Sequence, residues 1–173
     1  MRFSCSGLLT LAFVIGMSAS SPAFAQSPSW GDIGVSFVGM EYDLSGVGTA
    51  PGLAVRATHD VSPHVVLELR GLFAKPDQQS GPSTLIVPEA QVQYRWNVAR
   101  LSPFVGVGGG TAFIKSPFTT DWDATISVSG GTGVRLSEQL GLVGEVRLRG
   151  VEWRFTGTIA EWGLGLAWRL PAF

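Results

Sequence analysis

Cysteine is nearly absent from this 173-residue chain, since Cys5 is its single cysteine. Cys5 lies among the marks of a secretory signal peptide: a positive start at Arg2, the apolar run Leu8–Met17 and the small–x–small sequence Ala23–Ala25. We expect cleavage before Gln26, which makes residues 1–25 a signal peptide and residues 26–173 one cysteine-free domain. This absence excludes a disulfide framework, and the signal peptide indicates export.

Long apolar runs are also missing after residue 25. No segment there approaches the roughly 20 apolar residues that a membrane-spanning helix needs. The chain is nevertheless 45% hydrophobic, so its apolar side chains must be covered in some other arrangement.

Positive charge is scarce and is carried by arginine. Only Lys75 and Lys115 are lysines, and the formal net charge of the whole chain is −1. No basic patch marks the chain as a nucleic-acid binder, so we expect no nucleic-acid partner.

What the sequence does have is an alternation of apolar and polar residues. In "LVGEVRLRGVEW" (residues 142–153) the charges Glu145, Arg147 and Arg149 fall on every second position. A period of two is typical of a β-strand with one polar and one apolar face. Turn residues recur between such segments and divide the domain into eight predicted strands: Ile33–Tyr42, Pro51–His59, Val65–Phe73, Leu85–Trp96, Phe104–Ile114, Ala124–Leu136, Leu142–Trp153 and Ile159–Leu170.

The length of these strands indicates whether they can cross a membrane. Each has at least nine residues, which matches the roughly 9–11 residues of a tilted strand that crosses a bilayer. Strands joined by hairpins place alternate turns on opposite sides, and an even number of strands places both chain ends on one side. We therefore predict an all-β fold, an eight-stranded antiparallel up-and-down transmembrane β-barrel.

The choice of charged residues indicates which face meets water. The strand charges are Arg and Glu without Lys, as suits a confined lumen in which guanidinium groups pair with carboxylates. Small residues such as Ser127 and Ser129 on the polar face leave room for Arg147 and Arg149. We expect the lumen to be filled by a charge network of Glu68, Arg70, Glu89, Arg95, Glu145, Arg147, Arg149 and Glu161, with Arg56, Arg135 and Arg169 as further candidates.

Two of these charge pairs have a predicted register. Pairing of the third and fourth strands sets Arg70 opposite Glu89, and a tight last hairpin sets Arg149 opposite Glu161. The favoured interpretation of the network is a polar plug that holds the barrel together; a gated small pore is the alternative.

Aromatic residues collect near the strand ends. We expect an aromatic girdle at two membrane interfaces, formed by Trp30, Trp96, Trp168 and Phe173 at one end and by Tyr42, Trp122, Trp153 and Trp162 at the other. A soluble lipocalin-like carrier would also alternate, but the polar lumen disfavours it.

These features together resemble a known family. A signal peptide, eight alternating strands and a terminal Phe173 are similar to the small OmpA/OmpX-type β-barrels of the Gram-negative outer membrane. The resemblance covers residues 26–173 and is architectural, and Phe173 is out of phase with the outward residues of the last strand. It implies insertion by the outer-membrane assembly machinery and contact with lipid and lipopolysaccharide, and we expect a monomer.

The residues that could carry chemistry are few. His59 and His64 flank the turn "DVSP" on the predicted periplasmic side, and a barrel enzyme that modifies lipid A needs its histidine at the outer rim. Asp121 and Asp123 share a predicted outer loop and could hold a cation. "GVGGGT" (106–111) lacks the Lys-Ser/Thr of a phosphate loop. We therefore expect no catalysis, no cofactor and no metal, and a structural or small porin-like role; a lipid A-modifying enzyme is the alternative.

Overall fold

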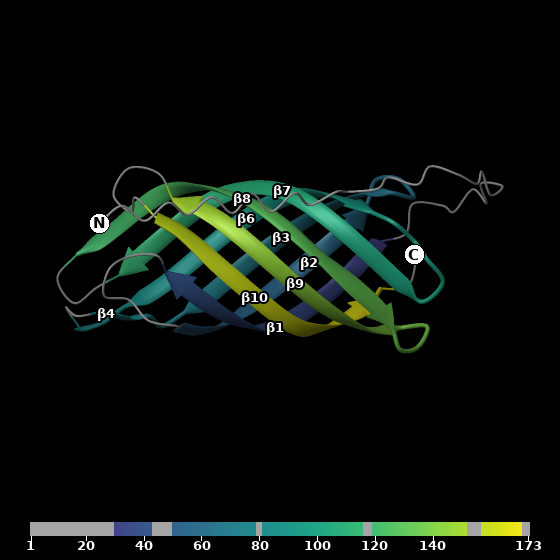
Figure 1. Ribbon diagram of the computed structural model, residues 1–173, viewed down its shortest axis with the longest axis horizontal. Coiled ribbons are helices and arrows are strands. Elements are labelled where there is room, and N and C mark those ends of the chain that lie inside the picture. The colour runs from purple at the N-terminus through teal and green to yellow at the C-terminus, as the bar shows by residue number, and fades with distance from the viewer. Residues whose placement is uncertain (1–29, 43–49, 79–80, 116–118, 152–156, 171–173) are drawn as a thin grey trace, which may run out of the picture.

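Eight long strands close into a β-barrel (Figure 1). The computed structural model describes residues 30–42, 50–78, 81–115, 119–151 and 157–170, so the predicted signal peptide lies outside the described residues. The barrel strands are β1 (Trp30–Tyr42), β2 (Ala50–Asp60), β3 (Val65–Ala74), β6 (Thr84–Arg95), β7 (Leu101–Lys115), β8 (Thr120–Arg135), β9 (Leu140–Val151) and β10 (Gly157–Arg169). Each pairs antiparallel with its neighbours in the chain, and β1 pairs with β10 to close the barrel.

The predicted fold class is confirmed. All eight predicted strands are present, and each is between 10 and 16 residues long. No helix in the described part of the chain is long and apolar enough to cross a membrane.

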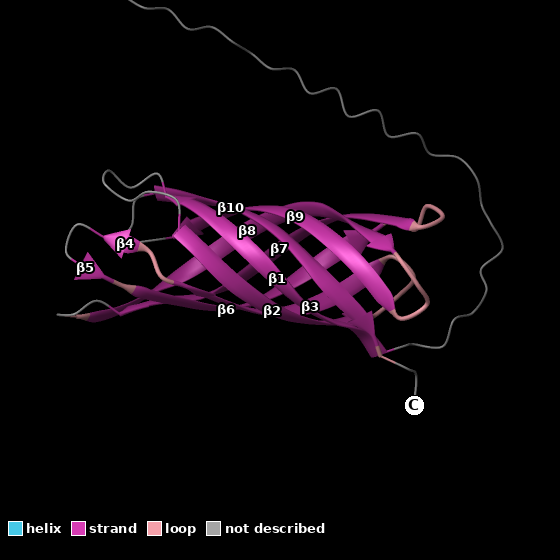
Figure 2. Ribbon diagram, turned by 90° about the horizontal axis from the view of Figure 1, so that it is seen from below, coloured by secondary structure: helices cyan, strands magenta, loops and turns pink. Residues whose placement is uncertain are grey.

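The two ends of the barrel differ (Figure 2). One end, the turn end, carries the short connections at 61–64, 96–100 and 136–139, together with the start of β1 and the end of β10. The other end, the loop end, carries the remaining connections, including a small hairpin of β4 (Asp77–Gln78) and β5 (Gly81–Pro82). The start of β1 and the end of β10 therefore lie on the same side of the barrel, as the even number of strands predicted.

Two connections contain more strand pairing than the sequence predicted. Asp121 and Asp123 lie inside β8 instead of in a loop, because β8 pairs with β7 as far as Thr120, which is opposite Lys115. Between β3 and β6, in the segment predicted to be a connection, the β4–β5 hairpin forms. Both differences extend antiparallel pairing beyond the point where the alternation of the sequence is clear.

The barrel is polar inside and apolar outside. Arg149 and Arg147 are 0% and 1% exposed, whereas Ile126 and Leu69 are 68% and 66% exposed. The polar face of each strand therefore points into the lumen, and the apolar face forms the outer surface.

The lumen is polar only over part of its length. Near the loop end it is filled by an apolar cluster of buried residues that includes Val38, Met40, Leu72, Leu85 and Val87. The inner face of β6 shows the change: Gln93, Gln91 and Glu89 are followed by Val87 and Leu85. The expectation of a lumen filled by polar side chains is therefore corrected, because the inward positions of several strands turn apolar toward the loop end.

Candidate functional site: the lumen charge network and its vestibule

Eight charged side chains from five strands meet in the middle of the lumen. The four arginines and four glutamates are Arg56 on β2, Glu68 and Arg70 on β3, Glu89 on β6, Glu145, Arg147 and Arg149 on β9, and Glu161 on β10. On each strand they occupy alternate positions, so the pleat points all of them inward. We call this set the lumen network.

Arg147 lies at the centre of the lumen network. Its guanidinium contacts Glu89, lies 2.6 Å from Glu145 Oε1 and lies 3.3 Å from Glu68 Oε1. Because a guanidinium presents five N–H donors in a fixed plane, one arginine can serve three carboxylates on three strands.

Arg149 continues the chain of ion pairs toward β10. It bridges Glu89 and Glu161, with its Nε 2.8 Å from Glu161 Oε1. Glu161 in turn lies 3.0 Å from Arg70 Nη1. With the longer contact of 3.7 Å between Arg56 Nη1 and Glu68 Oε2, seven ion pairs connect all eight residues.

Neutral polar groups complete the lumen network. Gln91 and Gln93 donate hydrogen bonds of 3.0 and 2.9 Å to the two carboxylate oxygens of Glu68. Ser127 donates to Glu89, and Arg149 donates to Thr125 Oγ1 at 3.2 Å. Buried charges are tolerated only when they are paired and hydrogen-bonded, and these contacts meet that requirement for both carboxylate oxygens of Glu68.

Glycines on the inner face of β7 make room for these side chains. Gly106, Gly108 and Gly110 lie opposite Gln93, Gln91 and Glu89 of β6. A Cβ atom on Gly108 would lie 2.5 Å from Gln91 Cβ, closer than two carbon atoms can approach. The glycine-rich stretch 106–111 is therefore packing space for the lumen network, lying in the middle of a strand.

The predicted pairing is correct in one register and wrong in the other. Arg70 does lie opposite Glu89, but its carboxylate partner at 3.0 Å is Glu161 on β10. Glu161 lies opposite Arg147, whereas Arg149 lies opposite Ile159 and reaches Glu161 diagonally. Hairpin register governs backbone neighbours, but closure of the barrel brings together side chains from strands that are not adjacent.

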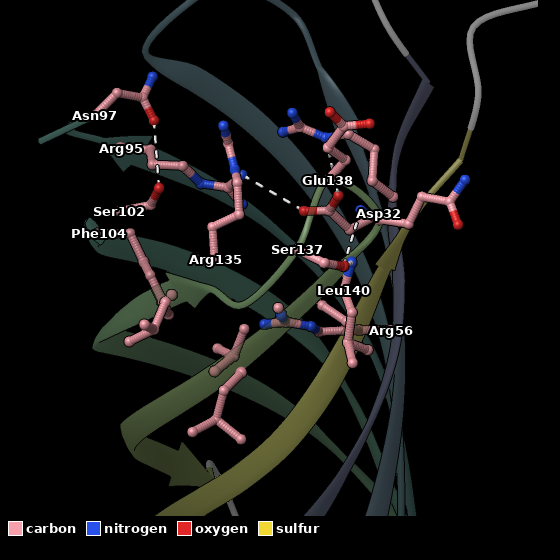
Figure 3. Close-up of a pocket in the computed structure, with 18 residues that line it drawn as sticks. Asp32, Arg56, Arg95, Asn97, Ser102, Phe104, Arg135, Ser137, Glu138 and Leu140 are labelled. Carbon is pink, nitrogen blue, oxygen red and sulfur yellow. Dashed lines mark hydrogen bonds and ion pairs between the residues drawn. The ribbon is translucent and has the colours of Figure 1, made fainter. Parts of the chain in front are cut away.

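Arg95 lies apart from the other predicted network residues, in a cavity that opens at the turn end (Figure 3). This cavity of about 80 Å³, the vestibule, is lined by Arg56, Arg95, Arg135 and Arg169 and by the acids Asp32 and Glu138. Asp32 lies 3.9 Å from Arg95 Nη1 and 3.5 Å from Arg169 Nε. Asp32 was not predicted from the sequence, although it lies on the same inner face of β1 as Gly34 and Ser36, at alternate positions.

The predicted girdle residues whose side chains are described lie on the outer surface in two groups. Trp122 and Trp162 are near the loop end, and Trp96 and Trp168 are near the turn end; all four are exposed. At the turn end Tyr94 joins them, with its ring 4.9 Å from that of Trp96 in an edge-on arrangement. The side chains of Trp30, Tyr42, Trp153 and Phe173 lie outside the described residues.

The residues considered for catalysis or metal binding do not form a cluster. His59 and His64 are both exposed at the turn end, where His64 Nδ1 lies 3.0 Å from the carbonyl oxygen of Arg95. Asp121 and Asp123 share a face of β8, and Asp123 is buried in the lumen. Within the described part of the chain no three His, Cys, Asp or Glu side chains are grouped as a metal site.

Comparison with solved structures places the fold among small outer-membrane barrels. Neisserial surface protein A superposes with a TM-score of 0.60 at 13% identity, over 83% of this chain and 98% of that one. The attachment invasion locus protein Ail of Yersinia pestis, solved with the heparin analogue sucrose octasulfate, gives a TM-score of 0.59 at 11% identity, over 83% of this chain and 100% of that one. The N-terminal β-barrel domain of Pseudomonas aeruginosa OprF gives 0.53 at 13% identity, over 80% and 98%.

These likenesses establish the fold alone. No protein-family model and no curated protein sequence matches the chain. The chain has the closed eight-stranded fold of the small outer-membrane β-barrels, as the sequence resemblance predicted.

Proposed function

We propose that this protein resides in the outer membrane as a closed structural barrel that neither conducts nor catalyses. The observation that carries the proposal is the inversion of polarity across each strand. Side chains such as Val55, Val107 and Val146 are 58–60% exposed on the outside, while Arg70, Arg147 and Arg149 are buried. A soluble carrier would place such an apolar belt in contact with water, whereas a bilayer solvates it.

Two layers of side chains obstruct the lumen. The lumen network crosses it from β2 and β3 to β9, and the apolar cluster around Met40 and Leu72 fills the section toward the loop end. Eight strands enclose an interior that side chains can just fill. This filling supports a structural role, because an ion would have to break several buried ion pairs and then pass an apolar section.

The partners in this proposal are those of a membrane-embedded barrel. The outer surface contacts phospholipid and lipopolysaccharide, and the outer-membrane assembly machinery inserts the chain after export with the signal peptide. The turn end faces the periplasm, since it holds the short connections. The protein is a monomer and takes no nucleic acid and no cofactor.

A catalytic role has less support. An enzyme acting on lipid A requires its histidine near the loop-end rim, and both histidines are exposed at the opposite end. His64 instead stacks on Tyr94, with ring centroids 5.6 Å apart, as part of the aromatic group at the turn end. We therefore propose that the protein is not an enzyme.

A small gated pore is the second candidate, and the vestibule favours it because it already opens part of the lumen from the turn end. Single-channel current recording from the refolded protein in planar bilayers distinguishes the closed structural barrel from the gated pore. We expect no conductance steps from the wild-type barrel. Steady wild-type steps that change in Arg147→Gln and persist unchanged in Arg100→Gln, an exposed turn residue, would replace the structural proposal with the pore.

A further inference from the structure

Three arginines that line the vestibule are more loosely paired than Arg147 and Arg149 at the centre of the lumen network. Arg56, Arg95 and Arg169 keep their carboxylate partners at 3.7, 3.9 and 3.5 Å, whereas the contacts of Arg147 and Arg149 are all 3.3 Å or shorter. Charge-assisted N–H···O hydrogen bonds are normally about 2.7–2.9 Å long. The vestibule guanidiniums therefore retain donor capacity that their carboxylates do not use.

Arg56 shows this most clearly. Its side chain is only 8% exposed, and its Nε has no hydrogen-bond partner among the described residues. Its guanidinium extends into the vestibule from β2 (Figure 3). A buried N–H donor without a partner is costly, so an acceptor in the vestibule would be bound favourably.

The charge and size of the vestibule narrow the class of acceptor. Its lining has four arginines against two acids, Asp32 and Glu138, and Arg135 and Glu138 stand at its solvent side. A volume of about 80 Å³ exceeds the space that one water needs, roughly 10–15 Å³ in the same measure. Planar guanidinium groups match the oxygen spacing of phosphate, and several arginines around one cavity suit an anion with more than one charged oxygen.

We propose that the vestibule is a binding site for a small tetrahedral oxyanion, phosphate either free or as a terminal monoester. Arg56 donates its Nε–H from the floor of the site. Arg95 and Arg169 contribute from opposite sides, with Asp32 between them setting their orientation. This site goes beyond the structural role proposed above, and it is accessible from the turn end alone because the lumen network closes it on the other side.

The test is an NMR titration of the refolded, detergent-solubilised barrel, following the arginine Nε–Hε signals. Potassium phosphate is added against potassium chloride at equal ionic strength. We expect the Arg56 signal to shift and saturate with phosphate but not with chloride, while the Arg100 signal stays in place. A parallel titration with glycerol 3-phosphate distinguishes the sources, since tighter binding of that compound identifies a monoester as the ligand.

Variants make the assignment specific. Arg56→Gln should weaken phosphate binding about tenfold or more, as expected for loss of a charge-assisted hydrogen bond, with Arg95 Hε as the reporter. Arg100→Gln, at the same end but outside the cavity, should bind like the wild type. Arg169→Gln, whose side chain is 42% exposed, replaces Arg56→Gln if that variant does not fold. Absence of a saturating shift at Arg56, or equal shifts with chloride, would overturn the site without affecting the membrane proposal.

Discussion

Glu89 is the acid that joins the two central arginines of the barrel. It contacts both Arg147 and Arg149 and accepts a hydrogen bond from Ser127, and it is 5% exposed. Removing one partner of a buried ion pair leaves the other charge unpaired, and this typically costs about 3–5 kcal/mol. The stability of the lumen network is therefore concentrated in a few carboxylates that each serve more than one arginine.

Glu89→Ala and Glu161→Ala should each lower the free energy of unfolding in detergent by about 3 kcal/mol, less where water enters the lumen. Double-mutant cycles measure the pairing directly. Glu161 should couple to Arg70→Ala and to Arg149→Ala by about 1–2 kcal/mol, because both arginines contact it within 3.0 Å.

The control for these substitutions is Glu138→Ala, which removes an exposed acid in the turn between β8 and β9. Its unfolding free energy should stay within about 0.5 kcal/mol of the wild type. Equal losses in Glu138→Ala and Glu161→Ala, or additive effects of Glu161→Ala and Arg70→Ala, would mean that the strand charges face water.

Sequence reasoning at the residue scale predicted every member of the lumen network except Arg56, which was a further candidate, and it wrongly included Arg95. It did not predict which members contact each other. Alternation alone places Glu68, Glu89 and Arg147 on the polar face. The contact between Arg70 and Glu161 spans 91 positions and joins β3 to β10, which are not neighbours in the barrel. Side-chain contacts across a lumen depend on closure, shear and side-chain length, and none of these has a local signature.

At the scale of single elements, β7 has an unusual inner face. Its inward positions 106, 108 and 110 are all glycine. Side chains of β6, such as Gln91, occupy the space beside these glycines. Gly108 can be compared with a control position, because Gly144 on β9 has open space where a Cβ atom would lie. Substitution of these two glycines tests whether the inner face of β7 carries glycine because larger side chains would not fit there.

Gly108→Ala should destabilise the barrel by about 1–3 kcal/mol, because the new methyl group would overlap Gln91 and approach Glu89 Oε1 to 3.0 Å. Gly144→Ala should be neutral or slightly stabilising, since alanine reduces the freedom of the unfolded chain. Urea unfolding of both variants gives the comparison. Equal stability of the two variants would contradict the packing role of the β7 glycines.

The connection between β6 and β7 contains a residue of unfavourable conformation. Ala99 has a φ of 54°, and it is the first of two residues between the bridged pair Val98 and Leu101. A positive φ at this position is typical of a type II′ hairpin turn, which favours glycine there.

Ala99→Gly should therefore raise the free energy of unfolding by about 0.5–1 kcal/mol, because removing Cβ relieves the left-handed strain. Ala57→Gly, in the middle of β2, is the matched control and should be destabilising. A loss of stability in Ala99→Gly similar to that in Ala57→Gly would show that the turn carries no such strain.

The strands themselves were predictable because their two faces meet different solvents, and each face therefore shows a period of two. The boundaries of the strands were less predictable from the sequence. "TTDW" reads as a loop, yet Trp122 pairs with Phe113 and extends β8 to Thr120. Pairing at a strand end depends on a neighbouring strand of equal length, which the local sequence does not reveal.

Considered as a whole, the molecule is layered along the barrel axis. An apolar cluster lies toward the loop end, the lumen network lies in the middle, and the vestibule opens at the turn end. The apolar layer was readable in "LIVPEAQ", where the inward residues change from Glu89 to Val87 and Leu85. The eight-stranded barrel as a whole followed from the length of the strands and from their even number.

The central claim is that the apolar faces of the strands contact lipid. Absence of cysteine from residues 26–173 allows single nitroxide labels to be placed cleanly at Ile126→Cys, Val146→Cys and Leu164→Cys, with Glu138→Cys in the turn as the control. The measurement is the accessibility of each label, in the barrel reconstituted in lipid, to apolar oxygen and to a polar nickel complex. We predict that oxygen reaches the three strand labels far better than nickel does, and that nickel reaches the turn label. Strand labels as accessible to nickel as the turn label would show that these faces meet water, and the barrel would then be a soluble protein.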